Sequence, residues 1–371
     1  MAVRIIDSTL REGRQSQFCD KILQLQIDHL QLMQKIGIVD VEYRNPSTGK
    51  DEIRKYKQLV DMFPDIHFYV HIFLNRKNID WVINEPSVKK VSTFVTLPLN
   101  EKTREELFFL FKRCNKTIRI GIENASSTSI VYIQNFVRKL VKEKFVKRIG
   151  FSDTLGLFTS ESIEQFLDSI TSFDFSGKDI EFHLHNDYGL AASNACKVLS
   201  QLEKFDSDIY LSASMLGIGD RNGILSIGDV FANLIRLKIP HDLNMKKYGT
   251  LVELFEKRDI NFSRDPVSSG SFSHFASSHI LGEMKNRGYT SLDPETFGMT
   301  PLYIFNRLTD TKVYNEIAKT ITNMPTLADG LLLKKYVLKR MKQRRLKFVY
   351  LDDVVKMLKT YASIKTSRRK H

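Results

Sequence analysis

Two histidines stand two residues apart in the stretch EFHLHND, residues 181–187. His183 and His185 follow an apolar run typical of a β-strand, and side chains at positions i and i+2 of a strand point to the same face. Imidazole is the commonest metal-binding side chain, so this pair could hold a divalent metal ion. Two satisfied polar residues at a strand end would explain the same pattern, so the rest of the chain must decide between the two interpretations.

Eight short β-rich runs alternate with amphipathic segments over roughly the first 240 residues, which predicts a (β/α)8 TIM barrel of the α/β class. The predicted strands are residues 3–7, 38–42, 67–73, 91–97, 118–123, 148–153, 180–185 and 209–214. A doubly wound open sheet is the alternative. It would normally have a glycine-rich phosphate-binding loop after its first strand, and DSTLREGRQ is not such a loop.

The strand pattern stops near residue 240. The stretch DPVSSGSFSHFASSH is small and polar, and helical patterns follow at about 302–320, 327–345 and 351–363. We therefore expect a catalytic barrel at 1–240, a linker and lid subdomain at 241–300, and a helical C-terminal subdomain with a basic tail at 301–371.

The net charge of +13 is concentrated at the C-terminus. From Lys334 to His371 there are 14 Lys and Arg against two acidic residues, whereas the rest of the chain has 42 against 41. This segment has no interleaved stacking aromatics typical of a nucleic-acid-binding module, so we expect a solvated helix face and no nucleic-acid partner. A non-catalytic barrel that binds polyanions through its basic tail is the alternative from another functional class.

The sequence also predicts the cellular setting. There is no run of about 18 apolar residues, so we expect no membrane span, and the N-terminus has no apolar stretch of signal-peptide length. Cys19, Cys114 and Cys196 are scattered without a C-x-x-C spacing, which favours free thiols in a reducing compartment. We expect a cytoplasmic protein.

Catalytic groups of a (β/α)8 barrel lie at the C-terminal ends of its strands. Polar residues gather at the ends predicted here, namely Asp7, Arg11, Glu12, Gln15, Glu42, Arg44, Asn75, Arg119, Glu123, Asp153, Thr154, His183, His185 and Asn186. A glutamate and two histidines can bind a divalent ion and leave coordination positions for substrate and water. The convergence of polar groups on one rim therefore strengthens the metal interpretation of the two histidines.

Several motifs occur in a fixed order along the chain. They are DSTLREGRQ (7–15), SDTLG (152–156), HLHNDYGLAASNA (183–195), LGIGDRNG (216–223), LDPETFGMT (292–300) and FNRLT (305–309). Together they resemble the metal-dependent acyltransferases and lyases that carry an Asp-Arg-Glu signature on a TIM barrel, the family of homocitrate, 2-isopropylmalate and citramalate synthases. The similarity is greatest to homocitrate synthases, which have a glutamate in the position of Glu12 and a GIG-acid-RNG string. It extends over nearly the whole chain.

This resemblance implies a metal-dependent condensation of acetyl-CoA with a 2-oxo acid, followed by thioester hydrolysis and release of CoA. Glu12, His183 and His185 would bind the divalent ion, which could be Zn, Mn, Mg or Co. The 2-oxo acid would chelate that ion, and Arg11 would stabilise the developing oxyanion. Gln15 and Thr154 would position the acceptor.

The resemblance also implies a proton-abstracting pair and a dimer. Glu123 matches a catalytic glutamate of the family, and His279 matches the histidine of a lid that pairs with it. Because the family's lid reaches over the partner subunit's barrel, we expect a homodimer with exchanged lids. A metal-dependent aldolase or lyase on the same scaffold is the alternative among enzymes.

The sequence departs from the family pattern in the residues that would recognise the acceptor. Arg14 replaces an acid, Asn75 stands where homocitrate synthases have a histidine, and the lid glycine is replaced by Ser277. No arginine near the fourth strand matches the one that holds a distal carboxylate.

The remaining candidates for substrate binding are Glu42, Arg44, Asn75 and Arg119, together with Arg14. Arg14 could grip a distal carboxylate, which favours a dicarboxylic 2-oxo acid. It could instead pair with Glu12, Glu42 or Asp7, and that alternative remains open.

Overall fold

The computed structural model describes residues 2–260, 272–285, 288–290, 294, 300–321 and 329–367, with side chains to residue 363. Its contacts divide the chain into two compact units. One unit comprises residues 1–14 and 18–266, and the other comprises residues 15–17 and 267–371.

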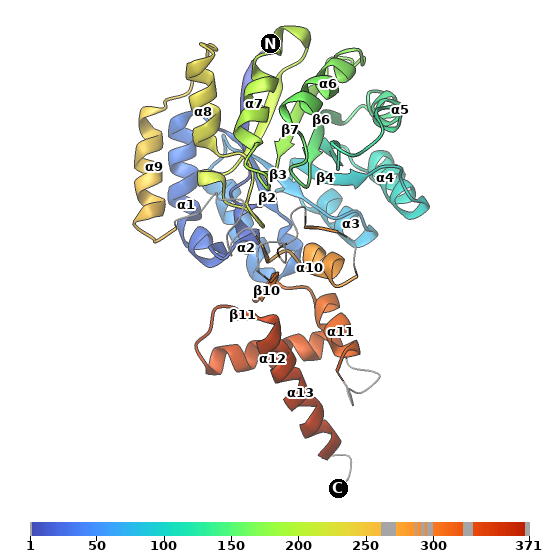
Figure 1. The fold of residues 1–371 in the computed structure, drawn as a ribbon, viewed down its shortest axis with the longest axis vertical. Coiled ribbons are helices and arrows are strands. Elements are labelled where there is room, and N and C mark those ends of the chain that lie inside the picture. Colours follow the sequence, from blue (N-terminus) through green and yellow to red (C-terminus); the bar gives the residue numbers. More distant parts are fainter. Residues whose placement is uncertain are drawn as a thin grey trace. The chain divides into compact units, whose positions relative to one another are not determined.

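The first unit is a closed barrel of eight parallel strands, seen in Figure 1 with helices around it. The strands are β1 (Val3–Asp7), β2 (Asp40–Arg44), β3 (His67–His71), β4 (Lys90–Thr96), β5 (Thr117–Glu123), β6 (Val146–Asp153), β7 (Asp179–Leu184) and β8 (Ile209–Ala213). The barrel closes where β1 pairs with β8, from Val3 opposite Ile209 to Asp7 opposite Ala213. The predicted (β/α)8 fold is confirmed.

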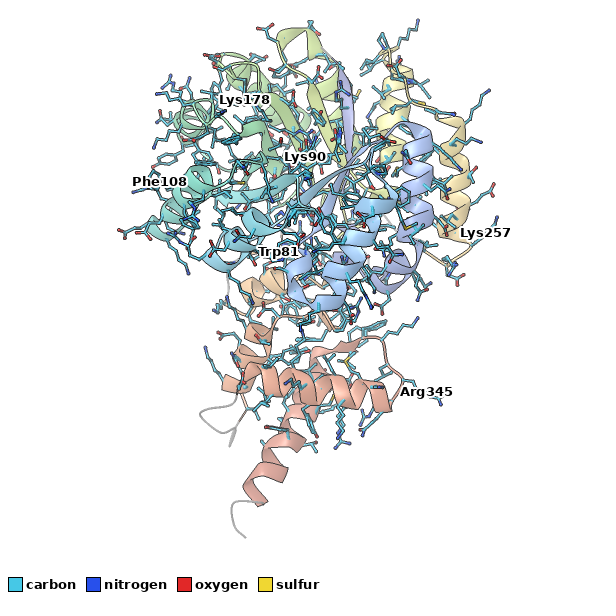
Figure 2. The ribbon with its side chains drawn as sticks, turned by 180° about the vertical axis from the view of Figure 1, so that it is seen from behind. Trp81, Lys90, Phe108, Lys178, Lys257 and Arg345 are labelled. Carbon is cyan, nitrogen blue, oxygen red and sulfur yellow. The ribbon has the colours of Figure 1, made fainter. Side chains whose placement is uncertain are left out.

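Amphipathic helices cover the outside of the barrel. They are α1 (Cys19–Ile36), α2 (Lys50–Met62), α3 (Arg76–Asn84), α4 (Glu101–Arg113), α5 (Ile130–Leu140), α6 (Ser160–Thr171), α7 (Ala191–Leu199), α8 (Ile227–Arg236) and α9 (Lys246–Glu256). Several begin at a residue whose side chain accepts a hydrogen bond from the first turn, as Thr159 and Ser226 do. Figure 2 shows Phe108 of α4 and Lys257, which follows α9, pointing away from the barrel on different sides.

The strands alternate between an apolar outer face and a polar inner face. In β2, Val41 and Tyr43 belong to the apolar core cluster of the unit, whereas the carboxylate of Glu42 contacts Ser92 and Arg119 from β4 and β5. The barrel interior therefore contains hydrogen-bonded charges. Buried charges are stable only when they are paired, so this network constrains how the strands align.

The second unit combines a small sheet with helices. Its strands β9 (Ser273–His274), β10 (Leu302–Phe305) and β11 (Val349–Tyr350) form a sheet in the order β11-β10-β9. Its helices are α10 (Ser277–Glu283), α11 (Thr311–Lys319), α12 (Gly330–Gln343) and α13 (Leu351–Ser367). A separate apolar cluster holds these elements together.

The predicted helix at 302–320 is wrong in its first part. Residues 302–305 form β10, because the run Leu-Tyr-Ile-Phe pairs with β9 on one side and β11 on the other. The motif at 292–300 lies mostly outside the described residues, as does the end of the basic tail. Among the described helices, none is both long enough and apolar enough to cross a membrane.

Candidate active site

Three potential metal ligands meet at the C-terminal end of the barrel. Glu12 follows β1, His183 lies near the end of β7 and His185 follows that strand. All three are buried, and one ligand atom from each lies within 4.8 Å of the others. Nε2 of His183 is 3.6 Å from Oε1 of Glu12. One carboxylate and two imidazoles at this spacing match the donor set of a mononuclear divalent site.

A chain of hydrogen bonds connects His183 to the carboxylate of Glu42. Nδ1 of His183 is 2.8 Å from Oγ of Ser212, which is 2.8 Å from Oγ of Ser8. Ser8 donates to Oε2 of Glu42 at 3.1 Å. Burial raises the pKa of Glu42, but the guanidinium groups of Arg11 and Arg119 outweigh burial and hold this pKa well below its ordinary value.

Because Glu42 is ionised, all the hydrogen bonds between His183 and Glu42 must donate in the same direction. A carboxylate only accepts, so the one hydroxyl proton of Ser8 points to Glu42, and Ser8 must accept from Ser212. The proton of Ser212 is then used as well, so Ser212 accepts from Nδ1–H of His183. Burial and the charge of Arg11 lower the pKa of His183, which favours the neutral ring. Its lone pair is on Nε2, the nitrogen nearer Glu12.

His185 is held from the opposite side of the site. NH2 of Arg221 lies 2.9 Å from Nδ1 of His185, and Arg221 is fixed by Asp187 at 2.7 Å. An arginine only donates, so Nδ1 accepts here and the proton of the neutral ring lies on Nε2. Metal binding by this ring requires it to lose that proton or to exchange the contact with Arg221. His183 fits the ion without such a change.

Arg11 lies beside the three ligands. It pairs with Glu12, and its Nε donates to Oε2 of Glu42 at 2.9 Å. Burial lowers the pKa of Arg11 from its ordinary value, although Glu42 opposes this effect. An arginine keeps its proton in proteins, so a buried positive charge is available at the site.

Two further aromatic side chains line the same region. Phe94 in β4 has its ring centroid 5.2 Å from that of His71 and 5.9 Å from that of His183. Burial, with a contribution from Arg11, lowers the pKa of His71 to about 3. Neither side chain was a candidate from the sequence. An inward-facing aromatic can be recognised only when the strand register is known.

The predicted acid–base and positioning residues at the rim lie on adjacent strands. Glu123 ends β5 and accepts a hydrogen bond from Oγ1 of Thr96 at 2.6 Å. Thr154 follows β6, and its hydroxyl accepts from the backbone N–H of Asn124 at 2.8 Å. Glu123 and Thr154 are each only partly buried.

Arg119 and Glu42 lie deeper than the rim. Arg119 is fully buried and pairs with both Glu42 and Glu181. Glu42 also accepts from Arg11, Ser8 and Ser92. Arg119 and Glu42 therefore connect and support the groups nearer the mouth. Arg44, at the end of β2, is partly buried and makes a small contribution to lowering the pKa of His71.

Arg14 and Asn75 have well-defined structural partners. NH2 of Arg14 donates to Oε2 of Glu52 at 2.7 Å, and its guanidinium lies 5.7 Å from the ring centroid of Tyr43. Tyr43 points outward from β2, so Arg14 lies in the layer between barrel and α2. Glu52 is not among the partners expected from the sequence. Asn75 accepts from the N–H of Asn78 at 3.0 Å and begins α3.

The two remaining candidates, Gln15 and His279, belong to the second unit. Gln15 ends a short 3-10 helix, Gly13–Gln15. His279 lies in α10, where its ring stacks on Tyr289 with a centroid distance of 4.7 Å. Their expected roles toward the barrel site remain predictions.

Comparison with known proteins agrees with the motifs. The family model described as HMGL-like matches residues 2–254. The cytosolic isozyme of homocitrate synthase from Saccharomyces cerevisiae is 24% identical, and the alignment covers 96% of this chain and 86% of that protein. Homocitrate synthase from Sulfurisphaera tokodaii is also 24% identical, over 83% of this chain and 70% of that protein.

Solved structures share the fold. An HMG-CoA lyase from Brucella melitensis has a TM-score of 0.57 at 14% identity, covering 70% of this chain and 99% of that chain. The carboxyl transferase domain of Rhizobium etli pyruvate carboxylase, solved with pyruvate and biocytin, has a TM-score of 0.58 at 14% identity. That match covers 93% of this chain and 61% of the other. By its fold and by the family model that spans its barrel, the chain belongs to the HMGL-like family, within the superfamily of TIM-barrel metallolyases.

Proposed function

We propose that this protein is a metal-dependent acyltransferase that condenses acetyl-CoA with a 2-oxo acid and releases CoA. The observation that carries the proposal is the convergence of Glu12, His183 and His185 beside the charged Arg11. The homocitrate synthases among its relatives support the acyl donor and the class of acceptor. A divalent ion held by these three residues would bind the 2-oxo acid and polarise its keto group.

The residues around the three ligands would carry out the proton transfers. A thioester α-proton is weakly acidic, so its removal needs a base and a nearby stabiliser of the enolate. Glu123 is partly exposed at the rim, where acetyl-CoA would enter. We assign it the role of base, together with His279 by resemblance. The enolate carbon would then attack the keto carbon, and Arg11 would stabilise the alkoxide that forms. Water would finally cleave the thioester.

The proposed acceptor is a 2-oxo acid, and Arg14 gives no reason to expect a distal carboxylate on it. The expected dicarboxylic preference rested on that residue, and its guanidinium is engaged by Glu52 behind β2. Thr154, Gln15 and Arg44 remain the proposed contacts to substrate. The exchanged-lid homodimer also remains part of the proposal, since it would bring His279 to the barrel of the partner subunit.

A thiol-detection assay tests the proposal. Wild-type protein loaded with Zn²⁺, Mn²⁺, Mg²⁺ or Co²⁺ should release CoA from acetyl-CoA only when a 2-oxo acid is present. Pyruvate, oxaloacetate, 2-oxoglutarate and 2-oxoisovalerate form the test panel. Glu123→Gln should lower kcat about 100-fold or more, while the exposed Glu161→Gln should not. CoA release that does not depend on any acceptor would favour a hydrolase, and cleavage of a 3-hydroxyacyl thioester to acetyl-CoA and a 2-oxo acid would favour a lyase.

A further inference from the structure

Phe94 occupies space inside the barrel that the neighbouring strand leaves empty. In the register of β4 and β5, Phe94 lies opposite Gly121. A Cβ atom built at Gly121 would lie 2.3 Å from Cδ1 of Phe94, far inside van der Waals contact. The ring can lie over β5 only because residue 121 has no side chain.

The ring borders the candidate metal site on one side and a buried cation on the other. Its centroid is 5.9 Å from that of His183 and 4.8 Å from the guanidinium carbon of Arg11. The guanidinium carbon of Arg119 is 4.6 Å from the same centroid. Phe94 is only partly buried, unlike its neighbours Thr93 and Val95. It is therefore part of the wall of the mouth.

Below the three ligands the barrel interior is occupied by buried, hydrogen-bonded side chains. Ser8, Ser92 and Ser212 are fully buried and hydrogen-bonded around Glu42. Farther toward the N-terminal ends of the strands, the guanidinium of Arg148 lies over the ring of Tyr210, 3.2 Å from its centroid. Acetyl-CoA must approach from the open, C-terminal end. An acceptor side chain directed inward toward β3–β5 then meets Phe94.

We propose that Phe94 determines acceptor specificity by limiting the length of the side chain on the 2-oxo acid, which makes a short one, of the size of pyruvate, the preferred class. This inference rests on the proposed function. The ring takes the volume next to the ligands that side-chain carbons beyond the methyl group of pyruvate would need. It also covers Arg119, whose charge is already matched by Glu42 and Glu181, so that cation does not attract a distal carboxylate.

Substitutions at positions 94 and 121 test the proposed limit on acceptor length by enlarging the space beside the ligands and then reducing it again. Phe94→Ala opens the space, and adding Gly121→Ala in that background refills part of it, because the ring that would clash is gone. Acceptors of increasing length are compared: pyruvate, 2-oxobutyrate, 2-oxovalerate, oxaloacetate and 2-oxoglutarate. Binding of each acid to the metal-loaded protein without acetyl-CoA is measured by calorimetry, and CoA release is measured separately. Phe68→Leu, which also removes an aromatic ring but in the layer outside the barrel, is the control.

Wild type should bind and use pyruvate best. In Phe94→Ala the ratio of kcat/KM for 2-oxovalerate over pyruvate should rise about tenfold or more, and the double variant should reverse part of that gain. Ratios are the readout because loss of the ring contact with Arg11 lowers all rates together. Phe68→Leu should leave the ratios unchanged. Equal binding of short and long acids by wild type and Phe94→Ala would overturn the size limit. Failure of every acid to release CoA, with graded binding intact, would instead refute only the acyltransferase function.

Discussion

Nδ1 of His183 lies 2.8 Å from Oγ of Ser212, and this contact is the first link of a chain of donors that ends on the ionised Glu42. The chain selects the tautomer of His183 that presents the lone pair of Nε2 toward Glu12. Ser212 in β8, Ser8 directly after β1 and Glu42 in β2 thus prepare one metal ligand. The buried charge of Glu42 is thereby linked to His183 through two hydroxyl groups.

Removing Ser212 should therefore weaken metal binding. In Ser212→Ala the Nδ1–H of His183 loses its acceptor, and we expect the affinity for Zn²⁺ or Co²⁺ to fall about 10–100-fold. Competition with a chromophoric chelator measures this directly.

Ser152 provides a matched control for that experiment. It lies opposite His183 in the register of β6 and β7, and its buried hydroxyl has no hydrogen-bond partner among the described residues. Ser152→Ala should keep wild-type affinity. If both variants bind the metal equally well, the hydroxyl chain has no role in preparing the ligand.

Arg14 should contribute to stability and leave substrate choice unaffected. Arg14→Met removes the guanidinium that pairs with the buried carboxylate of Glu52, which should lower the free energy of unfolding by about 3–5 kcal/mol. Adding Glu52→Leu should recover much of that loss, because the carboxylate that lost this guanidinium is then absent as well. Urea denaturation of wild type and of the single and double variants gives the coupling free energy between Arg14 and Glu52. A variant with normal stability that selectively loses dicarboxylic acceptors would restore the substrate role for Arg14.

His71 should make the fold sensitive to acid. Its pKa is about 3 in the folded chain and an ordinary 6.5 in the unfolded chain. Between these values the unfolded state binds the extra proton, so the stabilisation present above pH 6.5 is lost as the pH falls. The free energy of unfolding should decline about 1.4 kcal/mol more per pH unit in wild type than in His71→Gln. Denaturation curves at several pH values down to 4 measure both slopes, and parallel slopes would contradict the assignment.

The proposed pairing of Glu123 with His279 across subunits predicts complementation. Glu123→Gln and His279→Ala chains should each be inactive alone. Mixed under conditions that exchange subunits, they should regain part of the wild-type CoA release, because one mouth in the mixed dimer carries both residues. Sedimentation should show a dimer. A monomer with full activity would rule out the exchanged lid.

Much of the fold could be predicted from the alternation of short β-rich runs with amphipathic segments. The second strand was placed at 38–42 and lies at Asp40–Arg44, because Ile38 and Val39 extend the apolar pattern while the true strand ends in charged residues. The strand Leu302–Phe305 was missed because its partners, β9 and β11, are distant in sequence and supply the pairing.

The candidate metal ligands could also be predicted. Side chains two residues apart in a strand point the same way, and the C-terminal ends of the strands of a barrel meet at one rim. The supporting residues could not be predicted. Ser8 and Ser212 act through the direction of their hydrogen bonds. The ring of Phe94 fits only because Gly121 has no side chain. Both relationships depend on the register of the strands, which the sequence does not show. Arg14 was expected at the mouth, but the short helix after β1 turns it over Tyr43.

The metal content of wild type and of His183→Ala, measured by elemental analysis on the samples used for CoA release, tests the central claim most directly. We predict one divalent ion per wild-type chain, with CoA release that stops on chelation and returns on reloading. His183→Ala should unfold cooperatively like wild type yet contain little metal and release no CoA. Full metal occupancy in a folded His183→Ala protein would contradict the assignment of the site.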